Sequence, residues 1–147
     1  MKLSDHFTLA ELCDSQTAAR LGLDNTPTPE IIDHLSLLCT TILEPARMAL
    51  GPLRISSGYR APAVNAAAGG AKDSPHMLGF AADVIPIEVS KRTFARWVQQ
   101  WVPFDQVILE FGTREQPAWI HVSARPPLRA EVLRILAGTG YEPAVLA

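Results

Sequence analysis

Apolar residues recur at three- and four-residue steps across residues 29–49, a spacing that predicts one long helix. The residues in this pattern are Ile31, Ile32, Leu35, Leu38, Ile42, Ala46 and Ala49. Thr28 suits the N-cap position and Pro29 the first helical position. Pro45 lies inside the pattern, and its ring and missing amide donor predict a kink there.

Two shorter helices are expected before the long one. Thr8 and Glu11 form a capping-box pattern, which predicts a helix ending near Cys13. Ser15 can cap a second helix that ends before Gly22. Residues 24–27 are rich in turn formers and separate these helices from the long one.

Short apolar or alternating runs predict strands at 53–56, 81–85, 107–109 and 119–123. Ser90 can cap a helix between two of these strands. The apolar face of that helix would carry Phe94, Trp97, Val98 and Trp101. Periodicity does not decide between a helix and a hairpin for residues 131–141, and we favour a hairpin.

The order of these elements indicates an α+β fold. No repeat or linker divides the 147 residues, so we expect a single domain over 1–147. Within it, residues 1–27 would form the N-terminal helices and loop, and residues 28–147 the core.

Composition excludes several classes of protein. Hydrophobic residues make up 48% and charged residues 19% of the chain, which is typical of a folded domain. The formal net charge is −2 and no basic run occurs, so we expect no nucleic-acid partner. No apolar stretch approaches the roughly 20 residues of a membrane span. Cys13 and Cys39 lack metal-site spacing and are expected to be buried free thiols.

Candidate chemistry centres on polar residues inside apolar strands. Asp83 lies in an apolar strand, where a buried carboxylate needs a cation or several donors. In the strand 119–123, alternation places Trp119, His121 and Ser123 on one face. Hydrolytic zinc sites use three histidine or carboxylate ligands, and His76, Asp83 and His121 supply such a set. His6 and His34 are expected to be solvated or locally hydrogen-bonded.

The segment 74–83, with the pattern SxHxxGxAxD, and the later strand histidine carry a resemblance. They resemble the zinc D-alanyl-D-alanine carboxypeptidase-like peptidases, which include phage endolysins and the hedgehog domain. The resemblance extends from residues 6–12 through 56–60 to 119–123 and is strongest to the phage and prophage branch. It implies a small, mostly antiparallel sheet with helices packed on one side, and one zinc ion on His76, Asp83 and His121.

By the same resemblance, the reaction would be hydrolysis of an amide bond in the peptidoglycan stem peptide. The bond would be that of a D-Ala-D-Ala carboxypeptidase or an L-Ala-D-Glu endopeptidase. Arg60 and Ser74 would hold the substrate, since Arg60 offers a planar fork for a carboxylate. The N-terminus has no apolar signal region. We therefore expect cytoplasmic synthesis and action on the wall after release or delivery, as for an endolysin.

A catalytic base must be found separately. Several relatives carry an acidic residue three positions before the last zinc histidine, but here that position is Ala118. Glu110 and Glu115 are the candidates, and Glu110 is favoured because residues 104–110 resemble the hedgehog strand that ends in a glutamate beside the metal. The absence of an acid at Ala118 leaves one alternative function, a catalytically inactive zinc-stabilised module that binds cell wall or protein.

Overall fold

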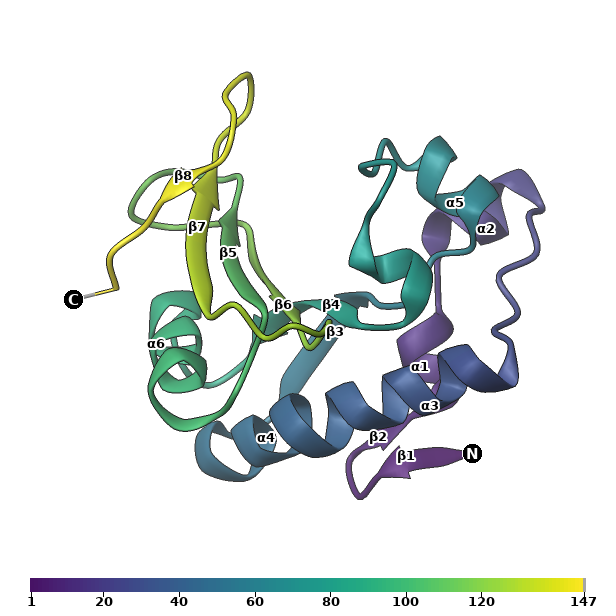
Figure 1. The fold of residues 1–147 in the computed structure, drawn as a ribbon, viewed down its shortest axis with the longest axis horizontal. Coiled ribbons are helices and arrows are strands. Elements are labelled where there is room, and N and C mark those ends of the chain that lie inside the picture. The colour runs from purple at the N-terminus through teal and green to yellow at the C-terminus, as the bar shows by residue number, and fades with distance from the viewer. Residues whose placement is uncertain (147) are drawn as a thin grey trace.

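The computed structural model describes residues 1–146, which form an α+β fold around a six-stranded sheet (Figure 1). The strands of this sheet are β3 (Leu53–Ser57), β4 (Ala81–Pro86), β5 (Gln106–Glu110), β6 (Trp119–Ser123), β7 (Glu131–Ile135) and β8 (Glu142–Pro143). They lie in the order β3-β4-β6-β5-β7-β8. All neighbours are antiparallel except β5 and β7, which run parallel. The expected mostly antiparallel sheet is confirmed.

The N-terminal segment begins with a small hairpin, β1 (Lys2–Ser4) and β2 (Phe7–Thr8), followed by α1 (Leu9–Cys13) and α2 (Gln16–Leu21). Thr8 caps α1 by accepting a hydrogen bond from the Glu11 amide at 3.2 Å. Ser15 caps α2 by accepting from the Ala18 amide at 3.1 Å. Gly22 ends α2 in the left-handed conformation, with φ 67°. Both predicted helices are confirmed.

The long helix is formed by three consecutive pieces, α3 (Pro29–Leu38), η1 (Cys39–Leu43) and α4 (Glu44–Leu50). Thr28 caps its start by accepting from the Ile31 amide at 3.3 Å. The middle piece is a π-helical turn, which ends two residues before Pro45. Pro45 cannot donate a hydrogen bond to the preceding turn. The structure accommodates it with this wide turn, and the helix continues to Leu50.

The remaining helices are α5 (Pro62–Ala67), the 3₁₀ helix η2 (Pro75–Leu78) and α6 (Lys91–Trp101). Ser90 caps α6 by accepting from the Thr93 amide at 3.0 Å. Phe94 and Val98 are buried, but Trp101 at the end of the helix is 63% exposed. The apolar face predicted for this helix is therefore buried only in part.

One face of the sheet, which we call the core face, packs against α3, η1, α4 and α6 (Figure 1). Its residues are Ala82, Val84, Val107, Leu109, Ile120 and Val122, and none is more than 1% exposed. Leu3, Phe7 and Leu12 of the N-terminal segment belong to the same hydrophobic cluster. Apolar burial of this kind is the main stabilising contribution to a domain of this size.

The C-terminal part of the described chain forms the favoured hairpin, in which Leu133 lies opposite Pro143. Neither cysteine forms a disulfide: Cys39 is buried, as predicted, whereas Cys13 is only half-buried. Between residues 1 and 146, no helix is long and apolar enough to cross a membrane.

Candidate metal centre

The strands β4, β6 and β5 bring polar residues together on the face opposite the core. Asp83 lies directly opposite His121, and His121 lies directly opposite Ile108. Because side chains alternate along a strand, the residues next to those of the core face point the other way. We call this surface the site face; its residues are Asp83, Ile108, Glu110, Trp119 and His121.

His76 reaches the same place from η2. Ser74 caps that helix by accepting a hydrogen bond from the His76 amide at 3.2 Å. Gly79 ends it with φ 77°, and a Cβ there would lie 2.8 Å from the backbone oxygen of Ile31. A residue with a side chain would therefore be both strained and crowded at this position. This tight turn connects η2, which carries His76, to β4.

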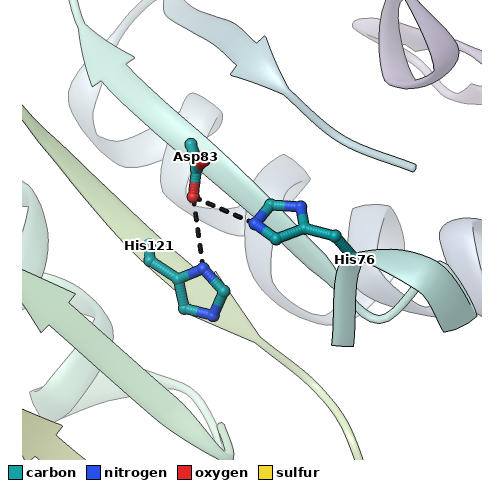
Figure 2. Close-up of side chains that lie close together, drawn as sticks. All are labelled: His76, Asp83 and His121. Atoms are coloured by element: carbon teal, nitrogen blue, oxygen red, sulfur yellow. Dashed lines mark hydrogen bonds and ion pairs between the residues drawn. The ribbon is translucent and has the colours of Figure 1, made fainter. Parts of the chain in front are cut away.

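The three side chains meet at one point (Figure 2). Asp83 Oδ1 lies 3.2 Å from His76 Nε2 and 3.2 Å from His121 Nδ1. One ligand atom from each residue lies within 4.8 Å of the other two. His76, Asp83 and His121 are 2%, 7% and 4% exposed, respectively. No other cluster with this geometry occurs in residues 1–146.

The ring of His76 is fixed by the backbone of Gly58. Its Nδ1 lies 2.7 Å from the Gly58 carbonyl oxygen, and a carbonyl only accepts hydrogen bonds. Nδ1 therefore carries a proton, and in the neutral ring Nε2 presents a lone pair towards the Asp83 carboxylate. Two electron-rich atoms this close require a proton or a cation between them. A histidine held in this way is typical of a metal ligand.

The donor set fits zinc. Two imidazoles and one carboxylate are ligands that zinc takes in hydrolytic sites, where a fourth position stays open. Zinc bonds of about 2.0–2.1 Å in a tetrahedron place ligand atoms about 3.3 Å apart. The two separations of 3.2 Å between Asp83 and the histidines agree with that value. The third separation, between the two histidine nitrogens, is below 4.8 Å, so the three ligand atoms are close enough to share one ion.

The electrostatics of the trio also favour a cation. Burial opposes ionisation of Asp83, but the charges and hydrogen bonds of His76 and His121 outweigh it and lower the pKa of the carboxyl group. Burial likewise favours the neutral ring of His121, yet its contact with Asp83 raises the pKa of the ring. Metal binding requires deprotonated ligands, so a proton shared within the trio would leave when zinc binds.

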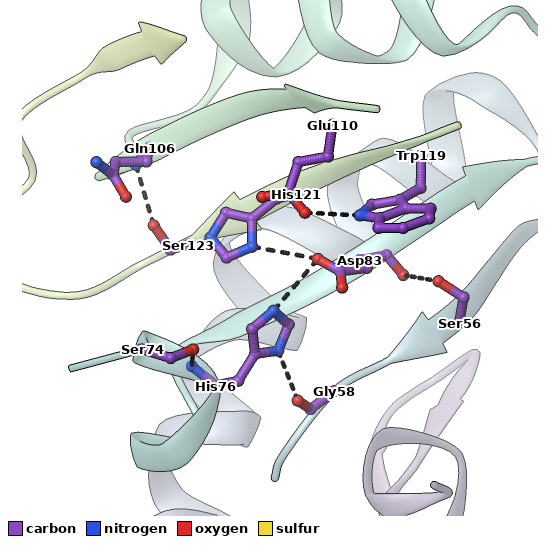
Figure 3. A network of polar contacts seen from close by, with 10 residues as sticks. All are labelled: Ser56, Gly58, Ser74, His76, Asp83, Gln106, Glu110, Trp119, His121 and Ser123. Atoms are coloured by element: carbon purple, nitrogen blue, oxygen red, sulfur yellow. Dashed lines mark hydrogen bonds and ion pairs between the residues drawn. The ribbon is translucent and has the colours of Figure 1, made fainter. Parts of the chain in front are cut away.

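Glu110 is the carboxylate that the structure brings beside the trio (Figure 3). It ends β5 opposite Trp119, whose indole Nε1 donates a hydrogen bond of 2.7 Å to Glu110 Oε1. Burial, the largest influence, raises the pKa of Glu110 above its usual value. A partly buried carboxylate beside a metal centre suits the transfer of protons to and from a bound water.

The other positions considered for the base lie outside the site. Glu115 is exposed in the loop between β5 and β6 and does not line the cavity described below. The amide of Ala118 donates to the Glu110 carbonyl at 3.0 Å, closing that loop. The acidic residue that several relatives carry at the position of Ala118 is absent here. The carboxylate of Glu110, on the adjoining strand, lies beside the trio instead.

A cavity of about 520 Å³ opens above the trio and is lined by Arg60, Ser74 and Glu110 among others. This volume lies within the range of small-ligand sites. The Nε atom of Arg60 is buried without a hydrogen-bond partner in the described chain. The Ser74 hydroxyl accepts from the His76 amide and keeps its own proton free to donate.

The remaining histidines are held elsewhere. His6 Nδ1 lies 2.6 Å from Glu44 Oε2. His34 stacks on Phe80 with ring centroids 4.0 Å apart, and its Nδ1 lies 2.6 Å from the Leu78 carbonyl oxygen. Both were expected to be solvated or locally hydrogen-bonded; both are hydrogen-bonded, but to residues 38 and 44 positions away in the sequence.

Two features of the site were not predicted from the sequence. The Gly58 carbonyl that orients His76 leaves no trace in residue type, because any residue has a carbonyl. The pairing of Trp119 with Glu110 depends on strand register, which the length of the loop at 111–118 does not reveal.

Comparison with known proteins agrees with this geometry. The sequence model of the family described as Peptidase M15 matches residues 5–123. The match includes all three residues of the trio, Glu110, Arg60 and Ser74, and it ends with the last residue of β6. No curated protein matches the chain.

Proposed function

Because the chain belongs to the peptidase M15 family of zinc-dependent metallopeptidases, we propose that it hydrolyses an amide bond in the stem peptide of bacterial peptidoglycan. The observation that carries this proposal is the buried trio of His76, Asp83 and His121 beside the Glu110 carboxylate, in a cavity large enough for a peptide segment. The bond would be the D-Ala-D-Ala or the L-Ala-D-Glu bond, as in endolysin-type peptidases.

In this proposal His76 Nε2, Asp83 Oδ1 and His121 Nδ1 hold the ion. Bound zinc supplies a Lewis acid that polarises the scissile carbonyl and lowers the pKa of water. Glu110 takes the proton of the attacking water and returns it to the leaving amine. Trp119 keeps the Glu110 carboxylate in place through the hydrogen bond of 2.7 Å.

Substrate binding is assigned to two residues: Arg60, whose charge is opposite to that of a carboxylate, and Ser74, whose hydroxyl proton is free to donate. The guanidinium of Arg60 would receive a carboxylate of the stem peptide in a bidentate contact. Ser74 would donate its hydroxyl proton to the peptide while its oxygen continues to cap η2. Both residues line the cavity, so neither assignment requires a movement of the backbone.

The proposal is tested by incubating the zinc-loaded protein with purified peptidoglycan and identifying the released fragments by mass spectrometry. The expected result is a single class of new termini, either free D-alanine or a new amino group on D-glutamate. The Glu110→Gln protein serves as the control and should release neither. Intact peptidoglycan after incubation with a folded, zinc-loaded wild-type protein would refute the proposed substrate.

The alternative is a catalytically inactive, zinc-stabilised module that binds cell wall or protein. Its motive was the missing acid at Ala118, and the carboxylate of Glu110 lies beside the trio on the adjoining strand. The Glu110→Gln protein separates the two readings, since a binding module should be unaffected by this change and a peptidase should lose most of its rate.

A further inference from the structure

Residues 124–146 lie beyond the segment matched by the family, yet they build part of the cavity. Arg125, Arg129, Leu133 and Tyr141 all line it. Figure 1 shows β7 and β8 continuing the sheet beyond β5, next to the strand that carries Glu110. We call the side of the cavity that these four residues form the wall. It is a feature of the chain that the matched segment alone does not supply.

The wall is firmly attached to the rest of the fold. Leu133 of β7 is paired with Ile108 of β5, so the register fixes its position relative to the site face. Buried Asp105 accepts hydrogen bonds from the side chain of Arg129 at 2.8 and 2.9 Å. The final described residue, Leu146, is buried in the hydrophobic core. The hairpin is thus held in place by the fold and forms a fixed part of the cavity lining.

The arginines of this wall already have partners. Arg129 binds Asp105 and also lies 3.4 Å from Glu131. Arg125 donates to the backbone oxygen of Asp73 at 3.3 Å, which ties the wall to the loop before η2. Tyr141 differs from both, because its hydroxyl makes no hydrogen bond within residues 1–146 and its side chain is 57% exposed.

The charges around Tyr141 determine what it can bind. Partial burial and then the negative charges of Glu110, Asp73 and Asp83 raise the pKa of the phenol. The hydroxyl therefore keeps its proton and acts as a donor. The backbone of a peptide offers neutral carbonyl oxygens as acceptors, and such an oxygen suits a phenol that lines the cavity with no partner of its own.

We propose that Tyr141 is a substrate-binding residue whose hydroxyl donates a hydrogen bond to a backbone carbonyl of the stem peptide, while Arg60 receives the carboxylate. This inference rests on the proposed function, because it takes the peptidoglycan stem peptide as the occupant of the cavity. It makes the hairpin 131–143 a determinant of substrate specificity. The contact exists in the ground state as well as in the transition state, so its loss raises KM and leaves kcat nearly unchanged.

The test compares Tyr141→Phe, which removes only the hydroxyl, with wild type in the hydrolysis of a soluble stem peptide. We expect KM to rise about tenfold with kcat within about twofold, as one substrate hydrogen bond would give. Zinc content and thermal stability should not change, because the side chain is largely exposed. Val145→Ala, an exposed change in the same segment outside the cavity, should match wild type in every measurement.

A binding measurement separates this inference from the proposed function. The affinity for the stem peptide is measured by calorimetry in Glu110→Gln and in Glu110→Gln/Tyr141→Phe, neither of which consumes the ligand. About tenfold weaker binding in the double variant supports the inference even if wild type fails to hydrolyse the peptide. Equal affinities, or equal KM values in the active proteins, overturn the role of Tyr141 alone. Absence of peptide binding in Glu110→Gln overturns both proposals.

Discussion

The core face and the site face are built by alternate residues of the same strands, but the first packs against helices and the second lines a cavity. On the core face Val84 and Ile120 are fully buried among apolar side chains. Their neighbours on the site face, Asp83 and His121, are 7% and 4% exposed but polar. Apolar burial stabilises the fold, whereas buried polar groups cost stability unless they are paired. One short strand can therefore serve stability and chemistry through alternate residues.

The two faces should therefore respond differently to substitution. A change on the core face should reduce the free energy of unfolding and leave the chemistry of each folded molecule intact. A change on the site face should abolish zinc binding or catalysis while the chain stays folded.

The largest effect is expected for Glu110→Gln, which removes the proton-transfer group from the site face. Loss of general acid and base catalysis should lower kcat by about 10²- to 10⁴-fold. Zinc content and the urea unfolding midpoint should remain those of wild type. Glu115→Gln is the matched control, because Glu115 is exposed and should leave kcat unchanged. A similar loss in both variants would remove Glu110 from its proposed role.

On the core face, Ile120→Ala should destabilise the protein by about 2–5 kcal/mol, because it leaves a cavity beneath the sheet. Urea unfolding followed by circular dichroism measures this change. At a temperature where the variant is folded, kcat should remain within about twofold of wild type. A loss of catalysis as large as that of Glu110→Gln would show that the two faces are not independent.

Zinc should stabilise the site face specifically. A ligand that binds only the folded state adds about 2.7 kcal/mol when its free concentration is about 100 times its dissociation constant. Wild type should show this increment between chelator-treated and zinc-loaded samples in thermal unfolding. His121→Ala should lose it. His34→Ala, which removes a histidine stacked on Phe80 away from the trio, should keep it.

The smallest effect is expected for Trp119→Phe, which removes the hydrogen bond to Glu110. That bond lowers the pKa of Glu110 and so opposes the effect of burial. Without it the pKa of Glu110 rises further, and the carboxylate is protonated at a higher pH. In the pH profile of kcat, the decrease on the acid side should therefore occur at a higher pH than in wild type. The Glu110 carboxylate also loses its anchor, so kcat should fall by up to about tenfold, as a lost hydrogen bond of about 1.5 kcal/mol gives. An unchanged profile would contradict the coupling.

Much of the fold could be predicted from local sequence. The caps at Thr8, Ser15 and Ser90 and the apolar strands are short-range signals, and the structure confirms the elements that they predict. The parallel pairing of β5 with β7 depends on contacts between distant segments and was not predicted. Exposure of Trp101 was missed for the same reason, since periodicity shows which residues share a face but not how far the neighbouring surface extends.

The residues of the site also divide into those that local sequence indicates and those that it does not. Asp83 and His121 stood out because polar residues inside apolar strands need partners, and His76 followed from motif spacing. Glu110 required the resemblance, because the loop at 111–118 hides its register with Trp119. Tyr141 carried no signal at all. Its place in the cavity results from the pairing of the C-terminal hairpin with β5.

The central claim is that His76, Asp83 and His121 bind one zinc ion, and calorimetric titration of the demetallated protein with zinc tests it most directly. Wild type should bind one ion per chain, with protons released as the metal displaces them. The single variants His76→Ala, Asp83→Ala and His121→Ala, shown to be folded by circular dichroism, should each lose this binding. A triple variant that binds zinc with the stoichiometry and affinity of wild type would contradict the claim.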